Sequence, residues 1–292
     1  MKTKSIESVI QPPEIHWVGN GFRVHNFIPG AELLAMERMN PFVMLDYNSK
    51  HYFPPSEKPR GVGVHPHRGF ETVTISYKGR IAHHDSNGGG GVIGEGDVQW
   101  MTAASGVLHK EYHEEEWSKQ GGDFHVVQLW VNLPAKYKMS KPRYQAISKS
   151  IMGKVQLPGN TGIVEVISGS YMGTDGPASS FTPVNLFNAH ISRNGKADFS
   201  FPANYNTALL VIEGTITVNE KETVAADNFI LFRNDGENFT ISAVDNSIVL
   251  IMSGEPINEP IAAYGPFVMN TRQEIIQAID DFNQGKFGSL ED

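Results

Sequence analysis

The sequence contains no cysteine among its 292 residues. Disulfide bonds, thiolate nucleophiles, zinc–thiolate sites and iron–sulfur clusters are therefore excluded. Any metal ion that the chain binds must be held by histidine, aspartate or glutamate. The 11 histidines are therefore the residues to examine for a metal site.

Long apolar runs and basic clusters are also missing. No stretch approaches the roughly 18 apolar residues that a membrane-spanning helix needs, and the first 15 residues lack the apolar core of a secretion signal. The formal net charge is −8, whereas nucleic-acid binding depends on clustered lysine and arginine. We therefore expect a cytoplasmic protein that binds neither membranes nor nucleic acid directly.

Glycine and proline are frequent, with 29 and 17 residues. They separate short runs of β-branched and aromatic residues, a pattern that predicts an all-β sandwich or barrel. The clearest predicted strands are 71–77, 125–133, 206–212, 215–219, 228–232 and 247–252.

One amphipathic helix is predicted near the C-terminus. Thr271 and Glu274 have the spacing of a capping box, and Gly285 is a stop signal. Four apolar residues between them fall on one helical face: Ile275, Ile276, Ile279 and Phe282. We expect this helix to pack on a sheet and to stabilise it.

The chain is long enough for two domains, and the Lys-rich, Pro-bounded segment 135–142 lies near its middle. We expect this segment to link a domain at 1–134 to a domain at 143–292. In each half an Ile/Val-rich strand ends in a glycine turn, at 72–79 and at 208–214. The first half has HPHRGFETVTISYKG where the second has FPANYNTALLVIEG, so only the first half is expected to bind a metal.

His65 and His67 are separated by one residue in a predicted strand. Because side chains alternate between the two faces of a strand, both imidazoles point to the same side. His109 and Glu111 repeat this spacing downstream. If the two strands are antiparallel neighbours, the four side chains converge on one point. Otherwise the two pairs are polar residues on a sheet surface.

Other residues near these positions have more than one interpretation. Three histidines are expected in loops or behind the ligands: His83, His84 and His113. His125 could line the site or take part in a buried hydrogen bond. Three apolar residues are expected in the core, although an aromatic substrate would also need such a wall: Phe70, Trp100 and Met101.

The motifs HPHRGFETVT, AHHDS, GDVQWMTAASGVLH-x-E, QLWVNLP and GEPINEPIAAYGPFVMNTRQEI together resemble those of the pirin family of the cupin superfamily. The resemblance runs from about residue 15 to the C-terminus. It implies two tandem cupin domains, which are double-stranded β-helices or jelly rolls, with a C-terminal helix. It also implies that Glu71 stays outside the coordination shell, that the C-terminal cupin binds no metal, and that one iron ion is held by His65, His67, His109 and Glu111.

The resemblance further implies a quercetin 2,3-dioxygenase-like activity, with a flavonol and dioxygen as substrates. The flavonol would bind through its deprotonated 3-hydroxyl, and its central ring would open with loss of carbon monoxide. Glu111 is the expected catalytic base as well as a ligand, and Glu71 is the second choice. Fe(II) is the expected cofactor, although three imidazoles and one carboxylate also suit Mn, Ni, Co or Cu.

The alternative that the resemblance leaves open is a regulatory protein without enzymatic activity. Such a protein would use the redox state of the bound iron to control its binding to a transcription factor or a metabolic enzyme.

Overall fold

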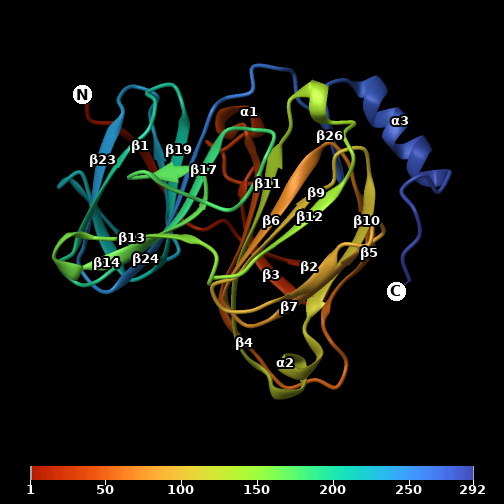
Figure 1. Cartoon of the computed structure of the whole chain (residues 1–292), viewed down its shortest axis with the longest axis horizontal. Helices are drawn as coiled ribbons and strands as arrows, with labels where there is room; N and C mark the ends of the chain where they lie inside the picture. Colours follow the sequence, from red (N-terminus) through yellow and green to blue (C-terminus); the bar gives the residue numbers. More distant parts are fainter. Residues whose placement is uncertain (1, 292) are drawn as a thin grey trace. The chain divides into compact units, whose positions relative to one another are not determined.

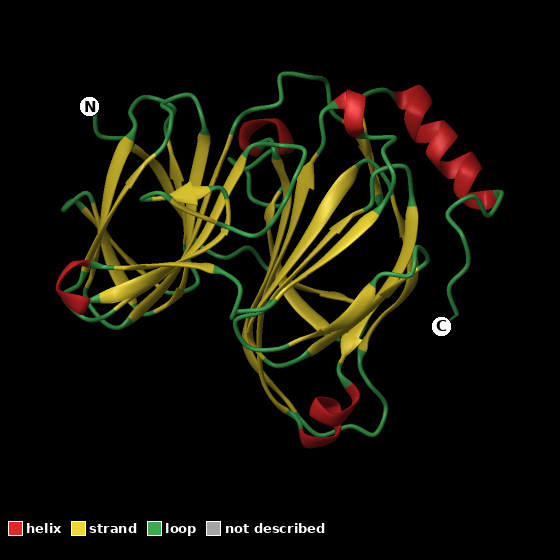
Figure 2. Cartoon of the chain, in the orientation of Figure 1, coloured by secondary structure: helices red, strands yellow, loops and turns green. Residues whose placement is uncertain are grey.

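Short β-branched and aromatic runs form strands through most of the chain, and the predicted all-β class is confirmed (Figure 2). The computed structural model describes residues 2–291 and contains two compact units (Figure 1). The unit that holds the predicted ligands, here called the histidine unit, comprises 14–37, 42–149 and the segment from Ile257 onward. The second unit comprises the segment up to Pro13, 38–41 and 150–256.

The histidine unit consists mainly of two antiparallel sheets. The larger sheet has the order β12 (Arg143–Ile147), β9 (Val98–Thr102), β6 (Phe70–Lys78), β11 (Gly122–Asn132), β4 (Phe42–Phe53), β3 (Phe22–Ile28) and β2 (Ile15–Val18). The smaller sheet has the order β5 (Gly61–His67), β10 (Val107–His113), β7 (Ile81–Asp85) and β8 (Gly90–Ile93). Buried side chains from both sheets share one apolar cluster, which includes Phe22, Phe53, Ile81 and Phe124.

The second unit repeats this plan. Its larger sheet has the order β1 (Ile6–Ile10), β22 (Phe229–Phe232), β19 (Asn206–Glu213), β24 (Ser247–Gly254), β17 (Val184–Ile191), β14 (Gly162–Ser168) and β13 (Gly153–Gln156). Its smaller sheet has the order β18 (Lys196–Ser200), β23 (Asn238–Ala243), β20 (Thr215–Val218) and β21 (Glu222–Ala225). A short hairpin follows β14, formed by β15 (Ser170–Tyr171) and β16 (Thr174–Asp175). The six strands predicted from the sequence correspond to β6, β11, β19, β20, β22 and β24.

The compact units differ from the expected division into 1–134 and 143–292. Each half of the chain contributes segments to the unit that is formed mainly by the other half. The N-terminal strand β1 pairs with β22 in the second unit, and β12 pairs with β9 in the histidine unit. The segment from Ile257 onward belongs to the histidine unit. A sheet edge can be completed by any strand that presents free backbone groups, so position along the chain does not decide which unit a terminal strand joins.

The segment expected to be a linker is ordered within the histidine unit. It contains the 3₁₀ helix η1 (Ala135–Tyr137), and the Lys138 side chain behind it is buried. The Lys138 ammonium donates hydrogen bonds to the carbonyl oxygens of Gly69 (2.7 Å) and Val268 (2.8 Å). A buried ammonium needs such partners, so Lys138 anchors this segment to the histidine unit.

Helix α3 (Arg272–Asn283) begins at the predicted capping box. The Glu274 amide donates to Thr271 Oγ1 (3.2 Å), and the Thr271 amide donates to Glu274 Oε2 (2.8 Å). Two short helices occur elsewhere, α1 (Met36–Met39) and α2 (Glu115–Gln120). None of the helices in the described chain is long and apolar enough to cross a membrane.

The predicted apolar face of α3 is wrong in part. Ile275 is buried, whereas Ile276 and Phe282 are 46% and 38% exposed. Asp281 lies on the buried side instead and forms an ion pair with Arg68, with 2.8 Å between Arg68 Nη1 and Asp281 Oδ2. An apolar pattern cannot reveal an inward carboxylate whose partner lies more than 200 residues away, so the buried position of Asp281 could not be predicted from the helix pattern. The helix follows a hairpin of β25 (Ala262–Tyr264) and β26 (Phe267–Met269).

Candidate metal centre

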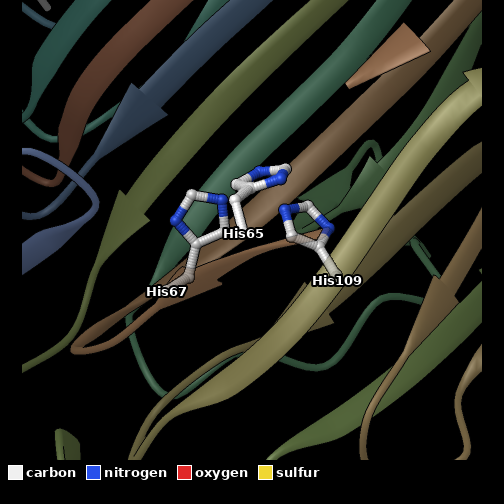
Figure 3. A group of neighbouring side chains, drawn as sticks. All are labelled: His65, His67 and His109. Carbon is white, nitrogen blue, oxygen red and sulfur yellow. The ribbon is translucent and has the colours of Figure 1, made fainter. Parts of the chain in front are cut away.

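Strand pairing brings the three predicted histidine ligands together (Figure 3). Strands β5 and β10 are antiparallel neighbours, and His65 lies directly opposite His109. The ring centroid of His109 is 4.2 Å from that of His65 and 4.6 Å from that of His67. One ring nitrogen of each of the three histidines lies within 4.8 Å of those of the other two. The geometric condition for convergence of these imidazoles is therefore met.

The protonation of these imidazoles suits metal binding. Burial, followed by the charges of the neighbouring histidines, holds the pKa values of His67 and His109 well below their usual range. Both rings are therefore neutral near pH 7, as a metal ligand must be. The carbonyl oxygen of Gly63 lies 2.8 Å from His65 Nδ1. Since a carbonyl only accepts, the proton of a neutral His65 lies on Nδ1, and Nε2 keeps a free lone pair.

Glu111 reaches the same region from β10 through a local irregularity. The pairing with β5 shifts between His109 and Glu111, so that Glu111 lies opposite Val62. On its other side Glu111 is opposite His83 of β7. Burial would raise the pKa of Glu111, but the nearby His83 and the hydrogen bond from Gln128 outweigh burial and lower it. The carboxylate is therefore ionised near pH 7.

Three side chains of the larger sheet hold the Glu111 carboxylate in place. Thr74 Oγ1 donates to Oε1 (3.2 Å), and the Gln99 amide donates to the same oxygen. The Gln128 amide donates to Oε2 (2.6 Å). A carboxylate that accepts several hydrogen bonds is both oriented and stabilised in its charged form. Glu111 thus connects the smaller sheet of the histidine unit to the larger one.

His83 contacts two of the predicted ligands. Its Nδ1 lies 3.4 Å from His109 Nδ1 and 3.9 Å from Glu111 Oε1. Its Nε2 lies 3.6 Å from Asp85 Oδ2, and its ring stacks on Tyr144 with 5.1 Å between centroids. His83, His109 and Glu111 form a second group in which one donor atom of each residue lies within 4.8 Å of those of the others. His109 is shared by both groups.

The remaining histidines near these strands lie elsewhere. His84 is exposed, and Tyr112 Oη lies 3.2 Å from its Nδ1. His113 is buried among aromatic rings, where burial lowers its pKa to about 4, and its Nε2 donates to Gly21 O (2.8 Å). His125 is buried with its Nε2 2.8 Å from Tyr47 Oη. Of the two interpretations of His125, the structure therefore favours the buried hydrogen bond.

Glu71 faces away from the histidines. Thr74, three residues along β6, faces Glu111, and the pairing of β6 with β9 is regular over this stretch. Residues three apart on a strand point to opposite faces. The Glu71 carboxylate accepts a hydrogen bond from Thr102 (2.7 Å) and lies 3.7 Å from Arg143 Nη2. This position disfavours Glu71 as the second-choice base.

A cavity adjoins the candidate metal centre inside the histidine unit. Its empty volume, counted up to the wall atoms and including the part that opens to solvent, is about 430 Å³. Half of its lining residues are apolar: Val18, Phe22, Val24, Val62 and Val126. The other half are polar: Asp46, Asn48, His65, Glu111 and Gln128.

The chain is similar to known proteins over most of its length. The family model described as Pirin matches residues 21–131, and the one described as Pirin C-terminal cupin domain matches residues 186–288. A Pseudomonas aeruginosa relative named "Putative quercetin 2,3-dioxygenase PA2418" is 45% identical over 93% of this chain and 94% of its own length. The chain belongs to the pirin family.

Two further relatives extend this result. Pirin-like protein 2 of Arabidopsis thaliana is 35% identical over 92% of this chain and 81% of its own length. The crystal structure of an Acinetobacter baumannii quercetin 2,3-dioxygenase has a TM-score of 0.93 and 42% identity, and the match covers 99% of this chain and 100% of that one. The pirin resemblance and the pair of cupin domains predicted from the sequence are therefore confirmed.

The donor set of this pirin-family chain fits a transition-metal ion. Neutral imidazoles and an ionised carboxylate are intermediate in softness between thiolate sites and all-oxygen sites. The buried His109 Nε2 has no hydrogen-bond partner among the described residues. A buried polar atom without a partner is costly, and a bound metal ion would remove that cost.

The three apolar residues expected in the core are core residues. Phe70, Trp100 and Met101 are all buried. Phe70 stacks on Trp130 with 4.1 Å between ring centroids, and its own centroid is 5.0 Å from that of His67. Phe70 and Trp130 support the imidazole of His67 from behind, which restricts the rotation of that ring.

Sequence reasoning missed a polar row that crosses the larger sheet. In the pairing register, Asn26 lies opposite Asp46, Asp46 opposite Gln128, Gln128 opposite Thr74, and Thr74 opposite Gln99. The row spans β3, β4, β11, β6 and β9, and Glu111 contacts three of its members. The only signal in the sequence was a polar side chain within each of five strands, and these positions could be aligned only once the register was known.

A His83→Gln variant is expected to bind metal about 10- to 100-fold more weakly than the wild type, as is typical when a residue that orients metal ligands is lost. The reason is that His83 contacts both His109 and Glu111. Competition with a chelator of known affinity measures this change. His84→Gln is the matched control, because it changes the exposed neighbour on the same strand. Equal affinities in the two variants would contradict the assigned role.

Proposed function

We propose that this pirin-family chain is an iron-dependent dioxygenase of the quercetin 2,3-dioxygenase type, which cleaves flavonol-like substrates oxidatively. The observation that carries the proposal is that His65 and Glu111 line one cavity that opens to solvent. A substrate in this cavity would lie beside both an imidazole and a carboxylate of the candidate metal centre. The names of the relatives with 45% and 42% identity support the same activity.

The residues proposed to hold the iron are His65, His67, His109 and Glu111. When bound, Fe(II) supplies a redox-active Lewis acid that allows an enol-bearing substrate and dioxygen to react. Four protein ligands also leave room for substrate at an ion that prefers six.

The chain's own contribution is to bind the substrate and to accept its proton. Glu111 is ionised and lines the cavity, so it can take the proton of a bound substrate hydroxyl as a general base. Gln128 and Thr74 keep the carboxylate from rotating. The valine and phenylalanine side chains of the cavity wall would pack against the aromatic rings of a bound flavonol and would exclude water from the reacting groups.

The direct test is to incubate the Fe(II)-loaded protein with quercetin in air. We expect the flavonol absorbance to fall in step with oxygen uptake and carbon monoxide release. The same protein loaded with redox-inactive Zn(II) is the control and should bind quercetin without consuming oxygen. A fully loaded Fe(II) protein that consumes no oxygen with quercetin would refute the proposed activity on this substrate. The redox-sensing regulator would then remain as the alternative.

A further inference from the structure

Asp46 is an acidic residue in the cavity wall that the proposed reaction does not use. It lies on β4 and lines the same space as His65 and Glu111. In the register of the sheet it lies opposite Gln128, whose amide holds the Glu111 carboxylate. The cavity therefore has two carboxylates on its wall, one from the candidate metal centre and one from the polar row.

One oxygen of Asp46 lacks a protein partner. Asn26 Nδ2 donates to Oδ1 (2.7 Å), whereas Oδ2 accepts no hydrogen bond from the described residues. Burial raises the pKa of Asp46, and the hydrogen bond from Asn26 and the charge of His16 oppose this shift. A carboxylate oxygen that is partly removed from water and has no donor is unfavourable. A hydroxyl donor on a bound ligand would satisfy it.

The neighbouring polar groups are already occupied. Asn48 Oδ1 accepts from the Arg23 amide (2.9 Å), and Asn48 Nδ2 donates to Ser49 O (3.1 Å). The amide group of Gln128 donates to Thr74 and Glu111. No lysine or arginine occurs among the described residues that line the cavity. Apart from the proposed metal ion, the cavity thus offers hydrogen-bond acceptors and no lysine or arginine.

These features define the ligand that complements the cavity. Its body is apolar and aromatic, because five of the ten lining residues are valine or phenylalanine. It donates hydrogen bonds at two separate positions, one toward Glu111 and one toward Asp46. It carries no carboxylate at the Asp46 end, because a like charge beside Asp46, with no lysine or arginine in the cavity wall, is disfavoured.

We propose that Asp46 is a specificity-determining residue that accepts a hydrogen bond from a second hydroxyl of the substrate, so that the cavity selects neutral polyhydroxylated aromatics and rejects those with a carboxylate. This inference rests on the proposed function, which supplies the reaction that the bound substrate undergoes. The selection of ligands by Asp46 is nevertheless a binding property and can be measured without turnover.

The test is anaerobic titration of the metal-loaded protein, which measures binding while no oxygen is present to react. The probes are quercetin, 3-hydroxyflavone, which keeps only the reacting hydroxyl, and 3-hydroxyflavone bearing a 4′-carboxylate. The wild type should bind quercetin at least about tenfold more tightly than 3-hydroxyflavone, as a hydrogen bond to a charged group implies. It should bind the carboxylate compound more weakly than either.

Asp46→Asn should reduce the preference for quercetin to about twofold and should improve binding of the carboxylate compound, because it removes the charge and keeps an acceptor for Asn26. Asp123→Asn is the matched control, since Asp123 is exposed and pairs with Lys50 on the surface. If Asp46→Asn does not fold, Asp46→Ala takes its place in the same comparison. An unchanged preference for quercetin in the folded variant overturns the proposal.

The outcomes separate this inference from the proposed function. A wild type that prefers quercetin through Asp46 but consumes no oxygen in air supports the inference and refutes the proposed activity. A wild type that turns over quercetin in air but binds quercetin and 3-hydroxyflavone with equal affinity supports the activity and overturns the inference.

Discussion

A His109→Ala variant is expected to lose metal binding almost completely, by at least about 100-fold in affinity, because it removes a ligand and not only a residue that orients one. His109 belongs to both groups of potential ligands in the histidine unit. Neither group can therefore compensate for its loss. The measurement is elemental analysis of the protein after reconstitution with Fe(II) and removal of unbound metal.

The matched control for this variant is His113→Ala. His113 lies on the same strand and is as fully buried as His109, but it packs among aromatic side chains and its Nε2 donates to a backbone carbonyl. Its loss should cost about 2 to 4 kcal/mol of unfolding free energy, as large-to-small core substitutions do, and should leave the metal content unchanged. A His109→Ala protein that still binds one ion per chain would disprove the proposed site.

Much of the candidate site follows from the alternation of side chains along strands. The spacing of His65 and His67 predicted a shared face, and the pairing of β5 with β10 brings His109 opposite His65. The three imidazoles meet because each segment is a strand and the two strands are neighbours in the sheet, whereas Glu111 groups with His83 and His109. The capping box of α3 is equally local, since Thr271 and Glu274 are three residues apart.

The parts that could not be predicted depend on register and on distant partners. The polar row that holds Glu111 combines residues from five strands, and a shift of one residue in any strand would turn its side chain to the other face. The place of Asp281 depends on Arg68, and the place of β1 depends on β22. Such pairings join residues more than 200 positions apart, and no pattern in either segment alone specifies the other.

A Glu111→Gln variant is expected to keep most of its metal but to turn over quercetin at least about 100-fold more slowly than the wild type, since general-base catalysis contributes about 10² to 10⁴ in rate. The amide cannot accept the substrate proton at neutral pH. Three imidazoles remain to hold the ion. The measurements are kcat/KM for quercetin and the iron content of the same preparation, so that loss of the base is separated from loss of the metal.

The surroundings of Glu111 add a second expected effect of this substitution. Both carboxylate oxygens accept hydrogen bonds from side-chain amides, Oε1 from Gln99 and Oε2 from Gln128. The new amide nitrogen must face one of these donors, which leaves a buried donor unpaired at a cost of about 1 to 3 kcal/mol in unfolding free energy. Glu71→Gln is the matched control, because Glu71 is also a buried glutamate of the histidine unit but lies on β6 of the larger sheet and faces Thr102. If the two variants lose activity equally, Glu111 is not the base.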